Sequence, residues 1–83
     1  MRKGAYLMIS NGIPSRETVE RVRKMYPIGC RVELISMDDS YSSLTPGTRG
    51  TVRSVDDTGT VFVRWDNGSG LGVVYGVDRI RKL

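Results

Sequence analysis

The chain has 83 residues and a mass of 9.2 kDa, which is enough for one small domain. Hydrophobic residues make up 39% and charged residues 27%, as in a soluble globular protein, and the net charge is +4. No apolar run approaches the roughly 20 residues that span a bilayer, and residues 5–9 are too short for the core of a signal peptide. Cys30 is the single cysteine and there is no histidine, which excludes an internal disulfide and histidine chemistry. We expect a cytoplasmic protein without a membrane segment.

The first part of the chain is expected to be a flexible arm followed by a helix. Residues 1–14 show no sustained periodicity and contain the turn pair Asn11-Gly12. Residues 15–26 are expected to form a helix that packs on the rest of the protein. Ser15 is a suitable N-cap residue, and Pro27 disfavours helical geometry just before it, so the helix should end near Met25.

The predicted helix has one apolar stripe. Val19 and Val22 are three residues apart, and either Met25 or Tyr26 continues the stripe. A helix of this length is marginal in isolation, so the stripe must pack on another element.

From residue 29 onward the hydrophobic period changes to two, which indicates β-strands. Asp56-Asp57-Thr58-Gly59 is typical of a tight hairpin turn with Gly59 at positive φ. Residues 76–78 suit a single helical turn, and a long loop is expected over residues 36–50. The expected strands cover residues 31–35, 51–55, 60–66, 71–75 and 79–82.

The second strand presents a conflict that predicts a β-bulge. If Asp56 faces Thr60 across the turn, regular pairing places Val52 outside and Arg53 in the core. An extra residue near Arg53 or Ser54 returns Val52 to the inner face.

Five short strands, tight hairpins and a helical turn before the last strand predict a mainly β fold, a small five-stranded SH3-like barrel with one N-terminal α-helix. Barrel closure would remove exposed sheet edges. The barrel would span residues 29–83, with the helical stripe on its side or open end and the outward Phe62 as one docking point. The expected core is Val32, Leu34, Val52, Val55, Val61, Val63, Trp65, Leu71, Val73 and Ile80.

The chain resembles a family of small uncharacterised bacterial and phage proteins that is catalogued as a domain of unknown function. The residues that carry the resemblance extend over nearly all of residues 14–83. They include Tyr26-Pro27-x-Gly29-x-Arg31-Val32-Glu33-Leu34, Pro46-Gly47-Thr48-x-Gly50-Thr51-Val52, Val55-Asp56-Asp57-x-Gly59-Thr60, Trp65-Asp66-Asn67-Gly68 and Gly76-Val77-Asp78. The resemblance implies an SH3-like fold and no assigned activity. Ser40 and Tyr75 stand where the family pattern would have proline. A shorter piece, Val63-x-Trp65-Asp66-Asn67-Gly68, is similar to barrels of large ubiquitin ligases that recognise protein partners.

Little in the sequence favours catalysis. The adjacent carboxylates at 38–39 and 56–57 lie in predicted turns, where aspartate bonds neighbouring amides. Cys30 lacks a histidine that could activate it. The glycines at 68, 70 and 72 lead into a strand, whereas a phosphate loop leads into a helix N-terminus. We therefore expect a non-enzymatic protein without a cofactor or bound metal.

Two binding hypotheses remain open. In the first, a protein or peptide partner, of the proline-rich or basic kind, binds an aromatic and acidic groove. The candidate residues are Asp38, Asp39, Tyr41 and Tyr75.

The second hypothesis is nucleic-acid binding by basic residues around an aromatic ring. Residues 1–29 hold six basic and two acidic residues, and residues 30–83 hold seven of each. All the net charge is thus on the arm and helix, so a solvated helix face is the simpler interpretation. The candidate residues are Arg21, Arg23, Lys24, Arg53, Phe62 and Arg64. Self-association through the helix stripe or the arm is a third hypothesis.

Overall fold

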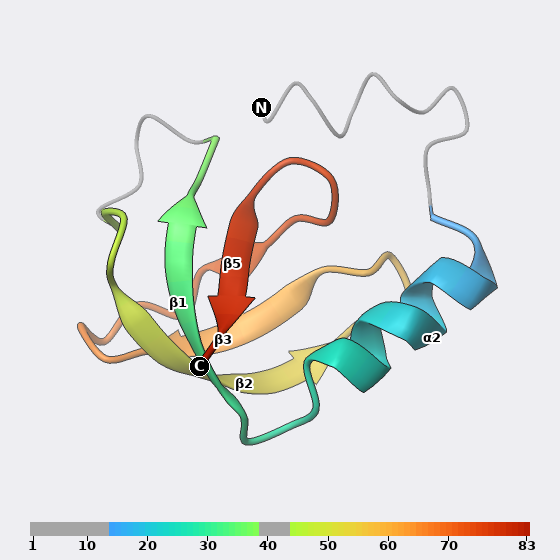
Figure 1. The fold of residues 1–83 in the computed structure, drawn as a ribbon, viewed down its shortest axis with the longest axis horizontal. Helices are drawn as coiled ribbons and strands as arrows, with labels where there is room; N and C mark the ends of the chain where they lie inside the picture. Colours follow the sequence, from blue (N-terminus) through green and yellow to red (C-terminus); the bar gives the residue numbers. More distant parts are fainter. Residues whose placement is uncertain (1–13, 39–43) are drawn as a thin grey trace.

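The computed structural model describes residues 14–38 and 44–83, which form one helix followed by five strands (Figure 1). The strands make one antiparallel sheet in the order β4-β3-β2-β1-β5. The predicted mainly β fold, with five strands and one N-terminal helix, is confirmed. The elements are α2 (Arg16–Met25), β1 (Arg31–Ser36), β2 (Arg49–Val55), β3 (Val61–Trp65), β4 (Gly72–Val73) and β5 (Arg79–Lys82).

The sheet curls strongly, since β1 and β5 stand upright in Figure 1 while β2 and β3 lie almost flat. The closure expected of a barrel is absent from the described residues: β4 pairs with β3 alone and β5 with β1 alone. β4 is also shorter than the predicted strand over residues 71–75, because the chain turns away after it. The N–H groups of Val77 and Asp78 both donate to the Val74 carbonyl, at 3.1 and 3.0 Å. The turn is not helical, since Gly76 has φ of 81°, so the single helical turn predicted over residues 76–78 is wrong.

Helix α2 begins and ends where the sequence predicts. The Ser15 side chain accepts a hydrogen bond from the Thr18 N–H, at 3.1 Å, and Tyr26 is the C-cap. Val19 and Val22 are buried, and Val22 belongs to the same hydrophobic cluster as the strands. The helix therefore covers the core side of the sheet. Phe62 points to the opposite face, so its expected role as a docking point for the helix is wrong.

The β2–β3 hairpin confirms both the turn and the bulge. Gly59 has φ of 80°, and the Asp56 N–H donates to the Thr60 carbonyl at 3.1 Å. Val52 pairs with Val63, whereas the next paired residue of β2 is Ser54. Arg53 is the extra residue of the bulge, which leaves Val52 buried and Arg53 exposed.

The core lies inside the curled sheet and under α2. Seven predicted core residues are buried, and the other three (Val55, Leu71 and Ile80) pack on them partly buried. Val22 and Leu44 complete the cluster. Leu44 was expected to lie in a loop, since no periodicity around it signals burial. The seven are Val32, Leu34, Val52, Val61, Val63, Trp65 and Val73.

Candidate functional site

Two predicted partner-binding residues, Asp38 and Tyr75, belong to segments that Asp78 ties together. The Asp78 carboxylate accepts the N–H of Asp38 at 2.8 Å and the N–H of Val74 at 2.8 Å. Asp78 is buried, whereas Asp38 and Tyr75 are exposed. Asp78 thus anchors the start of the long loop to the β4–β5 turn. Asp39, Tyr41 and the predicted arm, apart from Pro14, lie outside the described residues.

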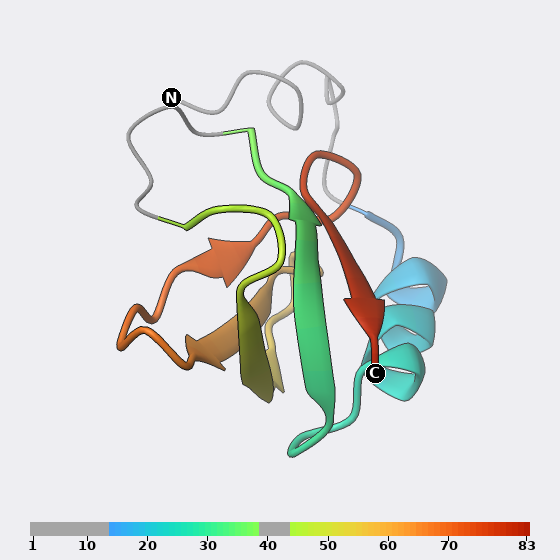
Figure 2. The ribbon, with the colours of Figure 1, turned by 60° about the vertical axis from the view of Figure 1, so that its left-hand side comes forward.

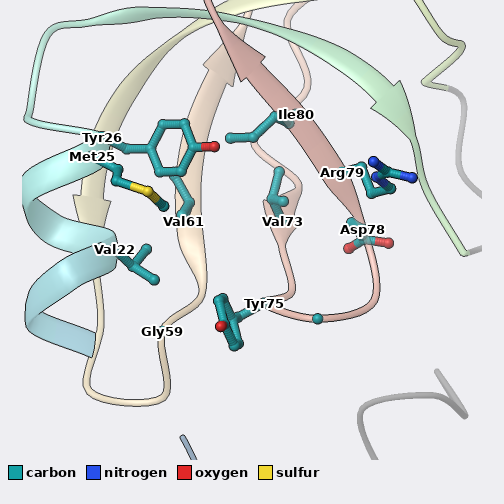
Figure 3. A pocket seen from close by; sticks show the side chains of 11 residues that line it. Val22, Met25, Tyr26, Gly59, Val61, Val73, Tyr75, Asp78, Arg79 and Ile80 are labelled. Carbon is teal, nitrogen blue, oxygen red and sulfur yellow. The ribbon is translucent and has the colours of Figure 1, made fainter. Parts of the chain in front are cut away.

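Tyr75 lines a groove of about 380 Å³ between α2 and the ends of β3, β4 and β5 (Figure 3). Figure 3 shows Tyr26 and Ile80 toward one end of the groove and Tyr75 toward the other. The apolar side chains that line it are Val22, Met25, Tyr26, Val61, Val73, Tyr75 and Ile80.

Two large apolar side chains at the groove are partly open to solvent. Met25 is 44% exposed and Tyr75 is 45% exposed, on opposite sides of the groove. Burial, and to a smaller extent the nearby Cys30 thiol, raises the pKa of the Tyr26 hydroxyl. Like an ordinary tyrosine, Tyr26 is protonated at neutral pH, and its hydroxyl can donate a hydrogen bond.

The charged groups around the groove are mostly basic. Arg79 borders it, with its guanidinium pointing away from Tyr26 and Tyr75 in Figure 3, and Arg21 lies one helical turn before Met25 on the same flank of α2. Neither arginine has an ion-pair partner in the described part of the chain. Asp78 also lines the groove, and its carboxylate accepts hydrogen bonds from the backbone amides of Asp38 and Val74.

Sequence reasoning found Tyr75 but did not assign Met25, Tyr26 and Ile80 to a site. Met25 and Tyr26 were left as alternatives for one apolar stripe, whereas both line the groove. Ile80 was expected in the core, and its partial burial reflects its place at the groove. In the sequence these three residues stand out only as apolar side chains near the end of a helix or the start of a strand. That pattern by itself indicates core packing and does not indicate a binding site.

Among the predicted nucleic-acid residues, Arg23 has a structural role. Its guanidinium donates to the Val55 carbonyl from Nε at 3.3 Å and pairs with Asp57 at 3.0 Å and Glu20 at 3.2 Å. The hydrogen bond that Arg23 donates to the Asp57 carboxylate is the largest cause of the raised pKa of Arg23. Arg23 thus fastens α2 to the β2–β3 hairpin. Arg21 and Lys24 are exposed on the helix surface.

Arg53, Phe62 and Arg64, by contrast, share the outer face of the sheet. Arg53 and Arg64 border an open hollow of about 640 Å³ that also includes Thr51. The Phe62 side chain points to the same face and is 37% exposed. Neither arginine forms an ion pair within the described residues.

The strand register adds three further arginines to this face. Arg31 lies opposite Thr51, which in turn lies opposite Arg64. Glu33 lies between Arg49 and Arg81 and pairs with both, at 3.4 and 3.0 Å.

Arg31 is paired within this face. Its guanidinium donates two hydrogen bonds to the Asp66 carboxylate, of 2.9 and 2.6 Å. These hydrogen bonds are the main reason that the pKa of Asp66 is lowered. Among the described residues the outer face therefore carries five arginines against two acids, although residues 30–83 are neutral as a whole. Counting charges along the sequence does not reveal this basic face, because the strand register that gathers the arginines is a property of the folded protein.

The described carboxylates and thiol that could serve in catalysis belong to separate segments of the chain. Asp56 belongs to the hairpin turn, and Cys30 is half-buried just before β1. Within residues 14–38 and 44–83, no group of three or more His, Cys, Asp or Glu side chains could hold a metal ion. In the same part of the chain, no helix combines the length and the apolar character that a bilayer-spanning helix needs.

The family model described as "Domain of unknown function (DUF4314)" matches residues 15–83. The match takes in α2 and all five strands. No match was found among the curated proteins. The resemblance drawn from the sequence motifs is thereby confirmed as membership of a family without an assigned activity.

Proposed function

We propose that this chain, which belongs to the family described as a domain of unknown function (DUF4314), is a non-enzymatic cytoplasmic interaction module. Its partner is a protein or peptide segment that binds in the groove between α2 and β5. The proposal rests on the groove itself, where Met25 and Tyr75 expose apolar surface on either side of a valine floor.

Physical chemistry supports binding at this place. A concave apolar surface with a few polar groups is the usual form of a binding site. Exposed apolar groups cost free energy in water and regain it when a partner covers them. Tyr26 and Tyr75 lose little conformational entropy on binding, since each has two side-chain torsions. The aromatic groove expected from the sequence thus has a counterpart here, with Tyr75 as the residue common to both.

A selection of random short peptides on the immobilised full chain tests the proposal. We expect binders whose affinity falls about tenfold or more in Tyr75→Ala and in Met25→Ala, the range of an interface hot spot. Phe62→Ala is the matched control, because it removes an exposed ring from the opposite face. A library without binders, or binders that are indifferent to both groove variants, would contradict the proposal.

A second candidate function, nucleic-acid binding, is favoured by the outer face of the sheet. Five arginines lie on the face to which Phe62 points, and Arg53 and Arg64 have no acidic partner in the described residues. Unpaired guanidinium groups bind phosphates, and an exposed ring stacks on a base. This site differs from the basic arm and helix expected from the sequence, because the Arg23 guanidinium on the helix is already hydrogen-bonded to Asp57.

Titration of a fluorescent single-stranded oligonucleotide at increasing salt tests this candidate. Phosphate contacts make affinity fall steeply with salt. We expect the Arg53→Ala, Arg64→Ala double variant to reduce the slope by about 1.4, since each contact with a single strand contributes about 0.7. Arg16→Ala, which removes an exposed charge from the helix start, should leave the slope nearly unchanged. An effect of Arg16→Ala that equals the effect of the double variant per charge removed would leave only non-specific attraction to a basic protein.

A further inference from the structure

Strand β5 has one edge that no strand covers in the described part of the chain. On its other side, the Leu83 N–H donates to the Arg31 carbonyl at 2.9 Å. Leu34, which lies opposite Ile80, directs its own N–H and C=O to Thr48 and Gly47, both at 2.8 Å. Ile80 is therefore in a pair without mutual hydrogen bonds, and its N–H and C=O point away from β1.

The same alternation places the backbone groups of Lys82 on the free edge, because Lys82 follows Ile80 by two residues. Two donors and two acceptors thus point outward along β5. Unpaired edge groups of this kind are a template for an added strand.

This edge borders the groove described above. Arg79 and Ile80 of β5 line the groove on one side, and α2 lines it on the other. Figure 2 shows β5 lying between β1 and the helix. An extended segment that lay along the edge would also cover the apolar floor made by Val61 and Val73.

We propose that the partner binds as an added β-strand, pairing with Ile80 and Lys82 while its apolar side chains enter the groove. This inference rests on the proposed peptide-binding function and names the mode of binding and the chemistry of the partner. Main-chain hydrogen bonds supply affinity in such complexes, and alternate side chains supply specificity.

The charges around the edge favour an acidic partner. β5 reads Arg-Ile-Arg-Lys, and Arg79 and Lys82 have no ion-pair partner in the described residues. Arg21 adds a positive charge on the facing flank of α2, with Glu17 a further turn away. The segment should therefore alternate acidic side chains with apolar ones.

A second copy of this chain is a poor occupant. Two β5 strands can pair along this edge only with outward residues opposite each other, so the antiparallel pair would be centred on Ile80 or on Arg81. The first arrangement places Arg79 against Arg81, and the second places Arg81 against Arg81. Like charges directly opposite each other destabilise a strand pair. The basic edge thus opposes self-pairing and accepts an acidic segment.

The peptides selected on the full chain provide the first test. We expect enriched sequences with acidic residues at alternate positions, separated by Val, Ile or Leu. With such a peptide bound, hydrogen exchange of the Ile80 and Lys82 amides should slow at least about tenfold, because these amides become hydrogen-bonded. The Arg81 amide, which already faces β1, should change much less.

Two substitutions of Lys82 distinguish the contribution of its backbone N–H to peptide binding from the contribution of its side-chain charge. Lys82→Pro removes the outward N–H while the pairs with β1 remain, since that N–H makes no bond to β1. We expect it to weaken peptide binding about tenfold, and Lys82→Ala, which keeps the N–H, to weaken it about two- to threefold. An unchanged β1–β5 exchange pattern in both variants verifies the fold.

The outcomes separate the two proposals. Proline-rich or basic binders that depend on Tyr75 and leave the Ile80 and Lys82 amides unprotected would overturn strand addition and keep groove binding. Binders that are insensitive to Tyr75→Ala and Met25→Ala would overturn both. Dimerisation of the free chain with protection of the same two amides would assign the edge to a second copy and likewise overturn the inference.

Discussion

Gly50 in β2 occupies a position where the backbone of β3 passes close to it. It lies opposite Trp65, and a Cβ at this position would lie 2.5 Å from Cγ1 of Val63 and 2.8 Å from the Arg64 carbonyl oxygen. A neighbouring backbone cannot give way as a flexible side chain can. The absence of a side chain at Gly50 is thus a condition of β2–β3 pairing.

Gly50→Ala is predicted to destabilise the protein by about 2–3 kcal/mol, the upper part of the range for overpacking. Gly70→Ala is the control, since a Cβ there meets nothing within 4 Å and Gly70 has no positive φ. Urea unfolding of both variants measures the difference. Similar midpoints for the two would contradict the close approach.

Asp56 makes stability depend on pH. Burial opposes ionisation of its carboxyl group, but hydrogen bonds from Thr58 and Thr60 outweigh burial and lower the pKa of Asp56. Because the pKa is lower in the folded protein, the stabilisation is complete above the ordinary aspartate pKa near about 4 and is lost as the pH falls through the folded value.

We therefore expect the free energy of unfolding to fall between about pH 5 and pH 2, with part of the fall due to Asp56. Asp56→Asn keeps an acceptor for the turn but removes the titration, so its profile should be flatter. Urea unfolding at several pH values measures both profiles. Parallel profiles would show that Asp56 titrates alike in the folded and unfolded chains.

At the scale of elements, helix α2 stabilises the sheet through few contacts. Val22 is 2% exposed within the cluster that the strands form, and Arg23 bonds the Val55 carbonyl. Since a small sheet protein has a small core, we expect the helix to contribute a large share of stability for its length.

Val22→Ala should cost about 2 kcal/mol, because it removes buried methyl groups and leaves a cavity. Met25→Ala, on the exposed flank, should cost well under about 1 kcal/mol. Thermal or urea unfolding distinguishes them. Equal losses would indicate that Met25 is packed rather than open to a partner.

The sequence correctly predicted the features that depend on residues close together in the chain. Ser15 and Pro27 marked the ends of α2, and Gly59 marked the hairpin. The alternation around Val52 even required the bulge at Arg53, because only an extra residue reconciles the two faces of β2. In each case the determining interactions lie within a few residues or along one strand pair.

What sequence reasoning missed depends on distant contacts. Leu44 is buried against strands that are remote in the chain, and the groove needs α2, β4 and β5 together. The short β4 follows from the turn at Val74, which the Asp78 carboxylate stabilises by accepting the Val74 N–H. The arginine face likewise depends on strand register, which alternation within one strand does not reveal.

At the scale of the whole molecule, the structure separates two surfaces that the net charge of +4 combines. The outer face carries five arginines and Phe62 and suits an anionic polymer. On the opposite side, the groove beside α2 offers apolar surface and a free strand edge. The proposed function assigns the partner to the groove.

Backbone amide chemical-shift mapping of the full chain with a selected peptide tests this assignment most directly. The account predicts that the largest shifts occur at Met25, Tyr75 and Ile80, with small shifts on the outer face. Largest shifts around Phe62 and Arg64, with the groove unchanged, would contradict it.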